Sequence, residues 1–340
     1  MSNKSTTIAI GCLTQWYEIE IFEEYVNSLI NALDNYEGTV YFDFCLYVPG
    51  HIKGMELTGL EECSLNSEDK DFLLEIETRW AELVNKVRTK NGYPKYHTLQ
   101  EISRNTTISK YRRDFNTKYC EQADVLVWGE TDMLLPRDAF NVINLIHTQI
   151  PNRPNQYIAT FATCKMWDKT WEVLEHPEVA DKPFIDNDYE NWWSYKYTMT
   201  QEEMDTINNK TEELDVRLIT DLKFNGCGLI ISSAIIKAGV NVPPAAFFVH
   251  EDTAFQNVLK QVFPKLHQYV IKNILLVHNR NHPKKRMYIK GETGDTMNKR
   301  RRSNPWYQLA NDYSQLNAYN LFNPKYTFKT WDDVWSKIKE

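Results

Sequence analysis

The chain has 340 residues, of which 42% are apolar, 13% aromatic and 25% charged, and its formal net charge is −7. This composition is typical of a globular protein with a large buried core and excludes an intrinsically disordered chain. No apolar run reaches the roughly 18 residues of a membrane span, and the N-terminus does not resemble a signal peptide, so we expect a cytoplasmic protein with no membrane partner.

The six cysteines are scattered along the chain without a C-x-x-C pair, and several lie in apolar segments. This pattern indicates reduced thiols in the core, and it speaks against a disulfide framework or a zinc site.

The charge is unevenly distributed. Residues 279–303 contain nine basic and two acidic side chains, a local charge of +7, so the remainder of the chain carries −14. A basic segment on an acidic protein predicts a local contact with a polyanion, and the alternative is a solvated surface loop.

The first segments predict an α/β fold. Residues 7–14 (TIAIGCLT) predict a strand, residues 21–33 repeat apolar side chains at helical spacing, and residues 39–48 (TVYFDFCLYV) predict a second strand. A strand, a helix and a strand in this order begin a doubly wound fold with a parallel sheet. A further helix is predicted from Asn66 or Ser67 to Asn91, because Ile76, Trp80 and Val87 share one of its faces.

Residues 123–136 (ADVLVWGETDMLLP) form the stretch around which the prediction is built. An apolar run from Val125 to Trp128 predicts a buried strand, and Gly129 and two carboxylates, Glu130 and Asp132, follow it. Ligands of open α/β sheets bind beyond the carboxyl ends of the strands, and paired acids suit a hard divalent cation. The stretch predicts a metal and phosphate site, and the alternative is an ordinary strand followed by an acidic turn.

The second half of the chain adds further strands and helices. Residues 157–164 predict a strand, residues 186–200 are rich in aromatic rings, and Thr200 begins a polar helix. Residues 224–240 (FNGCGLIISSAIIKAGV) predict a strand and then a helix. Glu251 and Asp252 begin another helix, and His278 follows an apolar strand.

In this order the motifs resemble those of the GT-A fold glycosyltransferases, particularly family 2 and the galactosyltransferase-like family 7. WGETDMLLP is similar to their Asp-x-Asp motif, with Glu130 in place of the usual first Asp. FNGCGLIIS followed by HEDTAF resembles their glycine-containing segment and Glu-Asp acceptor motif, and His278 resembles their third metal ligand. RRDFN (112–116) is similar to their Arg-Asn element, whereas CLTQW stands where family 2 usually has a Thr-Tyr-Asn turn.

The resemblance covers roughly residues 7 to 280 and implies a GT-A (Rossmann-like) α/β fold. Its mixed, mainly parallel sheet would be flanked by helices, with an aromatic-rich insertion. The glycosyltransferase domain would span residues 1–280, with a nucleotide-sugar half at about 1–135 and an acceptor half at about 136–280. A basic C-terminal extension, residues 281–340, would follow it.

The resemblance also implies a metal-dependent hexosyl- or pentosyltransferase that uses a nucleotide-diphosphate sugar, with a UDP-sugar favoured. Asp132, His278 and Glu130 would hold Mn²⁺ or Mg²⁺, which acts as a Lewis acid on the diphosphate. Asp252 would be the general base and Glu251 would orient the acceptor. The alternatives are a helix cap for Asp252 and a structural histidine for His278, with His250 and His282 as substitute ligands. The predicted nucleotide-sugar residues are Cys12, Leu13, Thr14, Arg113, Glu130, Thr131, Gly226 and Lys284.

The acceptor is predicted from charge and composition. The basic segment suits a phosphate backbone, and the Asn-, Lys- and Tyr-rich composition resembles that of T-even-type bacteriophage proteins, some of which glycosylate 5-hydroxymethylcytosine in DNA. The leading hypothesis is a DNA-modifying glycosyltransferase in the host cytoplasm. A glycan- or protein-directed enzyme and a non-catalytic nucleotide- or DNA-binding protein on the same fold are the alternatives. The predicted acceptor-binding residues are Trp192, Trp193, Arg280, Lys285, Arg286, Arg300, Arg301 and Arg302.

Overall fold

The structure is a computed structural model that describes most of the chain. The described residues are 5–34, 36–47, 67–90, 96–103, 106–164, 173–180, 198–220, 224–279 and 305–339. None of the helices in these ranges is long and apolar enough to cross a membrane.

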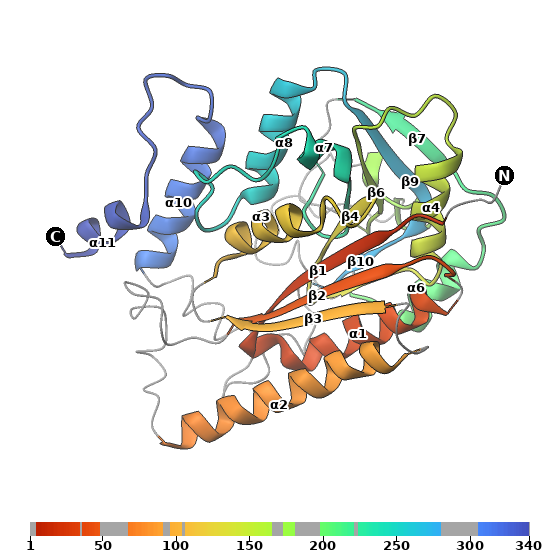
Figure 1. Cartoon of the computed structure of the whole chain (residues 1–340), viewed down its shortest axis with the longest axis horizontal. Coiled ribbons are helices and arrows are strands. Elements are labelled where there is room, and N and C mark those ends of the chain that lie inside the picture. Colours follow the sequence, from red (N-terminus) through yellow and green to blue (C-terminus); the bar gives the residue numbers. More distant parts are fainter. Residues whose placement is uncertain are drawn as a thin grey trace.

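An eight-stranded mixed sheet forms the centre of the described part, in the order β3-β2-β1-β4-β8-β6-β9-β7 (Figure 1). The first four of these neighbours are parallel, β8 is antiparallel to both β4 and β6, and β7 is antiparallel to β9 at the edge. The predicted mixed, mainly parallel sheet is therefore confirmed. The strands are β1 (Ile8–Gln15), β2 (Val40–Tyr47), β3 (Tyr96–Ser103), β4 (Val125–Gly129), β6 (Tyr157–Ala162), β7 (Val216–Ile219), β8 (Leu229–Ser232) and β9 (His267–Leu275).

Helices cover both faces of the sheet, which is why its central strands read as continuous apolar runs. Along β1, Ile8 and Ile10 belong to the core beneath one face, whereas Ala9 and Leu13 belong to the core beneath the other. The first face is covered by α1 (Ile19–Leu33), α2 (Ser67–Thr89) and α4 (Ala139–Gln149). The second face is covered by α3 (Ile108–Tyr119), α7 (Ser233–Lys237) and α8 (Glu251–Val262).

Most of the predicted elements are confirmed, and the structure contains further elements that were not predicted. The predicted polar helix is α6 (Gln201–Asn208), whose capping box joins Thr200 and Glu203. The edge strands β3 and β7 and the helices α3 and α4 were not predicted, and neither were the two helices near the C-terminus. The short elements are η1 (Trp16–Glu18), α5 (Pro177–Ala180), and a two-stranded sheet of β5 (Met133–Leu134) and β10 (Val277–His278).

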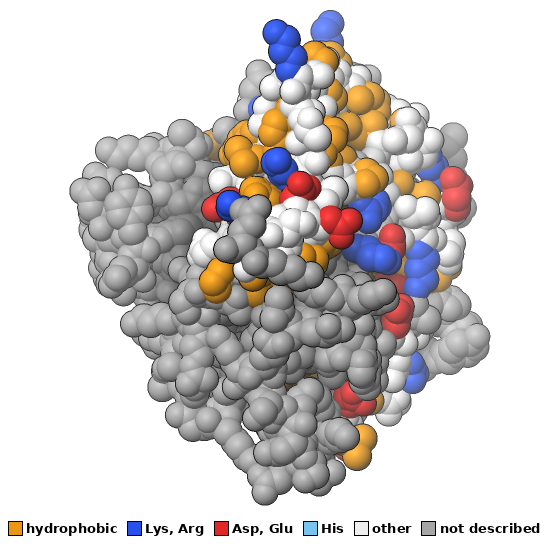
Figure 2. Space-filling view, turned by 90° about the vertical axis from the view of Figure 1, so that its left-hand side faces the viewer, with side chains coloured by type: hydrophobic (Ala, Val, Ile, Leu, Met, Phe, Trp, Pro, Cys, Tyr) orange, Lys and Arg blue, Asp and Glu red, His pale blue; other side chains and the backbone are white. Residues whose placement is uncertain are grey.

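Two helices follow near the C-terminus: α10 (Pro305–Tyr319) lies beside α8, and α11 (Trp331–Lys339) packs against α10 farther from the sheet (Figure 1). Phe248, Trp306 and Val334 form a buried cluster that joins these helices to the segment before α8. Figure 2 shows the face that lies on the left-hand side of Figure 1. On this face the described surface mixes hydrophobic side chains with charges of both signs. The described part of this face is therefore not a uniformly basic surface.

Candidate active site

The two acidic side chains of the predicted metal motif follow the carboxyl end of β4, as expected. A Cβ on Gly129 would lie 2.3 Å from the Tyr25 hydroxyl and 2.9 Å from the Gly11 carbonyl oxygen, so only glycine fits between β1 and α1 here. The chain then turns away from the sheet, with the Met133 N–H donating to the Glu130 carbonyl at 3.1 Å. Both carboxylates are thereby held beyond the end of a central strand.

The small sheet brings His278 to these acids from a distant part of the sequence. In that sheet His278 pairs with Met133, and the Asn279 N–H donates to the Asp132 carbonyl at 2.7 Å. His278 Nε2 lies 3.0 Å from Glu130 Oε2 and 3.4 Å from Asp132 Oδ1. The three predicted metal ligands therefore converge.

The charges at this point favour a cation between the acids. Burial lowers the pKa of His278, but Cys227, Asp132 and Glu130 outweigh burial and raise it well above its usual value. Burial also acts to raise the pKa of Glu130, whereas His278 and Arg112 lower it to about 2. His278 thus lies between two carboxylates that favour its charged form. A divalent ion would meet the same negative charge and the same donor atoms there, so these residues fit a bound metal.

Arg112 of α3 lies directly behind the acids. Its Nη2 donates to Glu130 Oε1 at 2.6 Å and to the Gly226 carbonyl at 3.3 Å, and its Nη1 donates to Glu251 Oε1. Its guanidinium lies over the Trp128 ring, 4.7 Å from the centroid. Burial acts to lower the pKa of Arg112, but Glu251 and Glu130 raise it, so the side chain stays charged. The sequence prediction named its neighbour Arg113 and missed Arg112.

Glu251 and Asp252 begin α8, but they face different surroundings. Glu251 is buried, and burial raises its pKa to about 7 against the attraction of Arg112. Asp252 is partly exposed, and its Oδ1 accepts the Thr253 N–H at 2.6 Å. Glu251 is therefore placed to hold Arg112, whereas Asp252 lies partly exposed at the positive end of the helix dipole.

Cys227 also reaches this site, and the sequence prediction did not include it among the site residues. The donor atoms of Glu130, Cys227 and His278 all lie within 4.8 Å of one another. Burial raises the pKa of Cys227 to about 11, and His278 opposes this shift. Cys227 is one of five free cysteines in the described part of the chain.

Most of the predicted nucleotide-sugar residues that the structure describes are buried. Cys12, Leu13 and Thr14 are buried at the end of β1. Thr131 is buried too, and its hydroxyl donates to Glu18 Oε2 at 2.9 Å. A Cβ on Gly226 would lie 2.2 Å from Arg112 Nη1, so this glycine gives the arginine its space.

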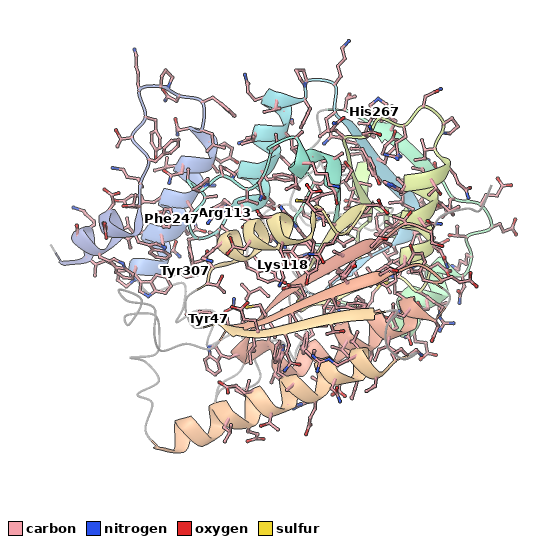
Figure 3. All side chains as sticks on the ribbon, viewed as in Figure 1. Tyr47, Arg113, Lys118, Phe247, His267 and Tyr307 are labelled. Carbon is pink, nitrogen blue, oxygen red and sulfur yellow. The ribbon has the colours of Figure 1, made fainter. Side chains whose placement is uncertain are left out.

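Arg113 lies on α3 with Lys118, and Tyr47 lies below them at the end of β2 (Figure 3). Successive residues of a helix point about 100° apart, so Arg113 cannot share the direction of Arg112. The other predicted binding residues lie outside the described residues: Lys284, Trp192, Trp193, Arg280, Lys285, Arg286, Arg300, Arg301 and Arg302.

No protein-family model matches the chain, and the comparison with curated proteins found no match. Among solved structures, Staphylococcus aureus TarS 1-349 is 10% identical, over 79% of this chain and 59% of that one, with a TM-score of 0.45. TarS 1-349 in complex with UDP-GlcNAc is 11% identical, over 98% of this chain and 71% of that one, with a TM-score of 0.45. The galactosyltransferase LgtC in complex with donor and acceptor sugar analogs is 10% identical. The match covers 78% of this chain and 68% of that one, with a TM-score of 0.31. At this level of likeness, what those proteins bind or transfer does not carry over to this chain.

Proposed function

We propose that the chain is a metal-dependent glycosyltransferase that moves a sugar from a nucleotide-diphosphate sugar, with a UDP-sugar favoured, to a hydroxyl group. The observation that most supports this is the convergence of Glu130, Asp132 and His278 beyond the carboxyl end of β4. Two acids and an imidazole at such a strand end suit a divalent ion and the phosphates that accompany it.

Each side chain has a role that follows from its surroundings. Glu130, Asp132 and His278 would hold Mn²⁺ or Mg²⁺, and such an ion supplies a Lewis acid for the leaving diphosphate. Arg112 fixes the positions of Glu130 and Glu251 through its two ion pairs. Asp252 is the proposed base: Oδ1 accepts the Thr253 N–H, and Oδ2 takes the proton of the attacking hydroxyl.

The acceptor that we propose is 5-hydroxymethylcytosine in DNA. Its support is the local charge of +7 in residues 279–303, which begin directly after His278. A glycan or protein acceptor is the alternative, and it would not need this charge.

The test is to offer nucleotide sugars to the purified full chain with Mn²⁺ and to measure release of the nucleoside diphosphate. Release should occur with a UDP-sugar, rise when hydroxymethylated DNA is added, and stop when EDTA removes the metal. Asp132→Asn should lower the rate by roughly 10² or more, because it removes a charge from the ion site. Asp114→Asn, the same change at an exposed position on α3, is the control.

Three results would contradict parts of this proposal. Release that is insensitive to EDTA and to Asp132→Asn would contradict the metal dependence. Release that rises with a glycan and not with DNA would contradict the DNA acceptor and favour the glycan acceptor. No release from any sugar, with nucleotide still bound, would favour a non-catalytic binding protein.

A further inference from the structure

The proposed metal site contains a donor of a different chemical kind, the thiol of Cys227. Within the described residues, the side chains of Glu130, Cys227 and His278 are the one set of three potential ligands whose donor atoms lie within 4.8 Å of one another. They come from the loop after β4, the loop before β8, and β10. Three separate elements therefore bring an oxygen, a sulfur and a nitrogen to one point.

The segment that carries Cys227 is held on both sides. The Cys227 N–H donates to Asn225 Oδ1 at 2.8 Å, and the Gly228 N–H donates to the Trp128 carbonyl at 2.8 Å. Gly228 has a φ of 69°, a left-handed conformation that glycine adopts without strain. The side chain of Cys227 is 1% exposed. Its sulfur is therefore placed by the fold and does not rest on a loose surface loop.

The spacing of the donors suits a small ion. Around a tetrahedral zinc ion, with bonds of about 2.0 to 2.3 Å, neighbouring donors are roughly 3.3 to 3.8 Å apart. His278 Nε2 lies 3.0 Å from Glu130 Oε2 and 3.4 Å from Asp132 Oδ1, so these donors already approach that spacing. The donor atoms of Glu130, Cys227 and His278 lie within 4.8 Å of one another, so side-chain movements of about 1 Å bring Cys227 to the same spacing.

The chemistry of sulfur separates the metals that a site prefers. Mg²⁺ binds oxygen and keeps several waters, whereas thiolate and imidazole together suit zinc and the later first-row ions. A site made of carboxylates alone would favour Mg²⁺ or Mn²⁺. The addition of a thiolate therefore changes which ion the site selects.

We propose that Cys227 Sγ binds the metal directly, together with Glu130 and His278. The site would then select a transition-metal ion, Mn²⁺ or a zinc-like ion, over Mg²⁺, which narrows the choice of ion given under the proposed function. When the metal binds, Cys227 loses its thiol proton to solvent. The thiolate sulfur then donates an electron pair to the ion. The inference rests on the proposed function only in placing an ion at these side chains. It would hold equally if the chain transferred no sugar.

The test is to add Co²⁺, a spectroscopic substitute for zinc, to the metal-free full chain and to record its absorption. A thiolate ligand gives a sulfur-to-cobalt charge-transfer band in the near ultraviolet, separate from the visible bands of bound cobalt. We expect this band in the native chain and its loss in Cys227→Ser. Cys120→Ser, a change at another buried cysteine, is the control and should keep the band.

One further measurement does not depend on the folding of the variant, and a second one measures the contribution of the sulfur to affinity. Zinc X-ray absorption of the native chain should show one sulfur at about 2.3 Å. In competition with a chelating dye, zinc affinity should fall at least about tenfold in Cys227→Ser, and excess Mg²⁺ should not displace Co²⁺.

A charge-transfer band that survives in Cys227→Ser, or a zinc spectrum with only nitrogen and oxygen neighbours, would overturn the inference. The same holds if the native chain binds neither Co²⁺ nor Zn²⁺. Failure of the proposed function shows differently: no nucleoside diphosphate would be released from any sugar, even though sulfur remained bound to the ion.

Discussion

Arg112 joins two acids that are far apart in the sequence, Glu130 and Glu251, inside the molecule. Removing one partner of a buried ion pair leaves an uncompensated charge, which costs about 3 to 5 kcal/mol. We expect Arg112→Met to lower the free energy of unfolding by that amount, measured by urea denaturation. Both ion pairs are lost at once, and Met keeps most of the side-chain volume.

The control for this change is Arg113→Met, on the same helix. Arg113 Nη1 is buried and has no hydrogen-bond partner within the described residues. Its removal should change the free energy of unfolding by less than about 0.5 kcal/mol. Equal losses in the two variants would show that the Arg112 ion pairs contribute nothing particular to stability.

Asp252 is the residue whose removal should separate catalysis from binding. Asp252→Asn keeps the size of the side chain and an acceptor for the Thr253 N–H, but it removes the base. We expect the transfer rate to fall by roughly 10² or more with the donor dissociation constant nearly unchanged. Calorimetric titration of the donor and steady-state turnover measure the two quantities. Turnover close to that of the native chain would show that Asp252 is not the base and serves only as a helix cap.

At the scale of the elements, the turn before β8 is shaped around Arg112. A Cβ on Gly226 would lie 2.2 Å from Arg112 Nη1, so Gly226→Ala should displace the guanidinium from its acids. We expect a loss of about 3 kcal/mol or more in the free energy of unfolding, comparable to breaking a buried ion pair.

The comparison for this variant is Gly239→Ala, where φ is 89° and nothing lies within 4 Å of the added Cβ. That change should cost only about 1 kcal/mol of backbone strain. In the background of Arg112→Met, Gly226→Ala should lose most of its effect, because the side chain that it displaces is gone. Additive losses in the double variant would show that Gly226→Ala lowers stability without acting through the Arg112 side chain.

The central strands were predicted from the sequence, whereas the edge strands and the helices α3, α4, α10 and α11 were not. The strands β1, β2 and β4 are buried on both faces and read as apolar runs. The missed helix α3 buries a narrow stripe of Tyr111, Phe115 and Tyr119 between basic residues. At the sheet edge, β7 has no fully buried residue, so its sequence does not differ from that of a loop.

The same distinction applies to the candidate site. Glu130, Asp132 and His278 were predicted because each follows an apolar strand and because their order resembles the motifs of GT-A glycosyltransferases. Arg112 and Cys227 depend on how α3 and the turn before β8 pack against Trp128. Tertiary contacts decide their placement, and one sequence does not contain that information in a local pattern.

At the scale of the whole molecule, the DNA acceptor predicts a strong salt dependence. Each neutralised phosphate contributes about −0.9 to the slope of log K against log salt. Reversing Arg300, Arg301 and Arg302 to Glu should make that slope shallower and abolish transfer to DNA, while slow hydrolysis of the donor sugar continues. Filter binding at several salt concentrations and the release assay measure these effects.

The matched control reverses Lys210, Lys237 and Lys265, three exposed lysines that give the same change in net charge. It should leave both the slope and the transfer nearly unchanged. A weak salt dependence, with normal turnover after the arginine reversals, would discard the DNA acceptor and leave the glycosyltransferase proposal standing.

The position of β8 in the sheet has a consequence for synthesis of the chain. The first four strands of the sheet, up to Gly129, are consecutive neighbours, but β4 gains its other neighbour only at Leu229. At about 5 to 20 residues per second, the ribosome takes roughly 5 to 20 seconds to make the intervening segment. During this time the edge of β4 that later pairs with β8 has no backbone hydrogen-bond partner in β8 on the nascent chain. The side chains of the proposed metal site are complete only later, when His278 has emerged.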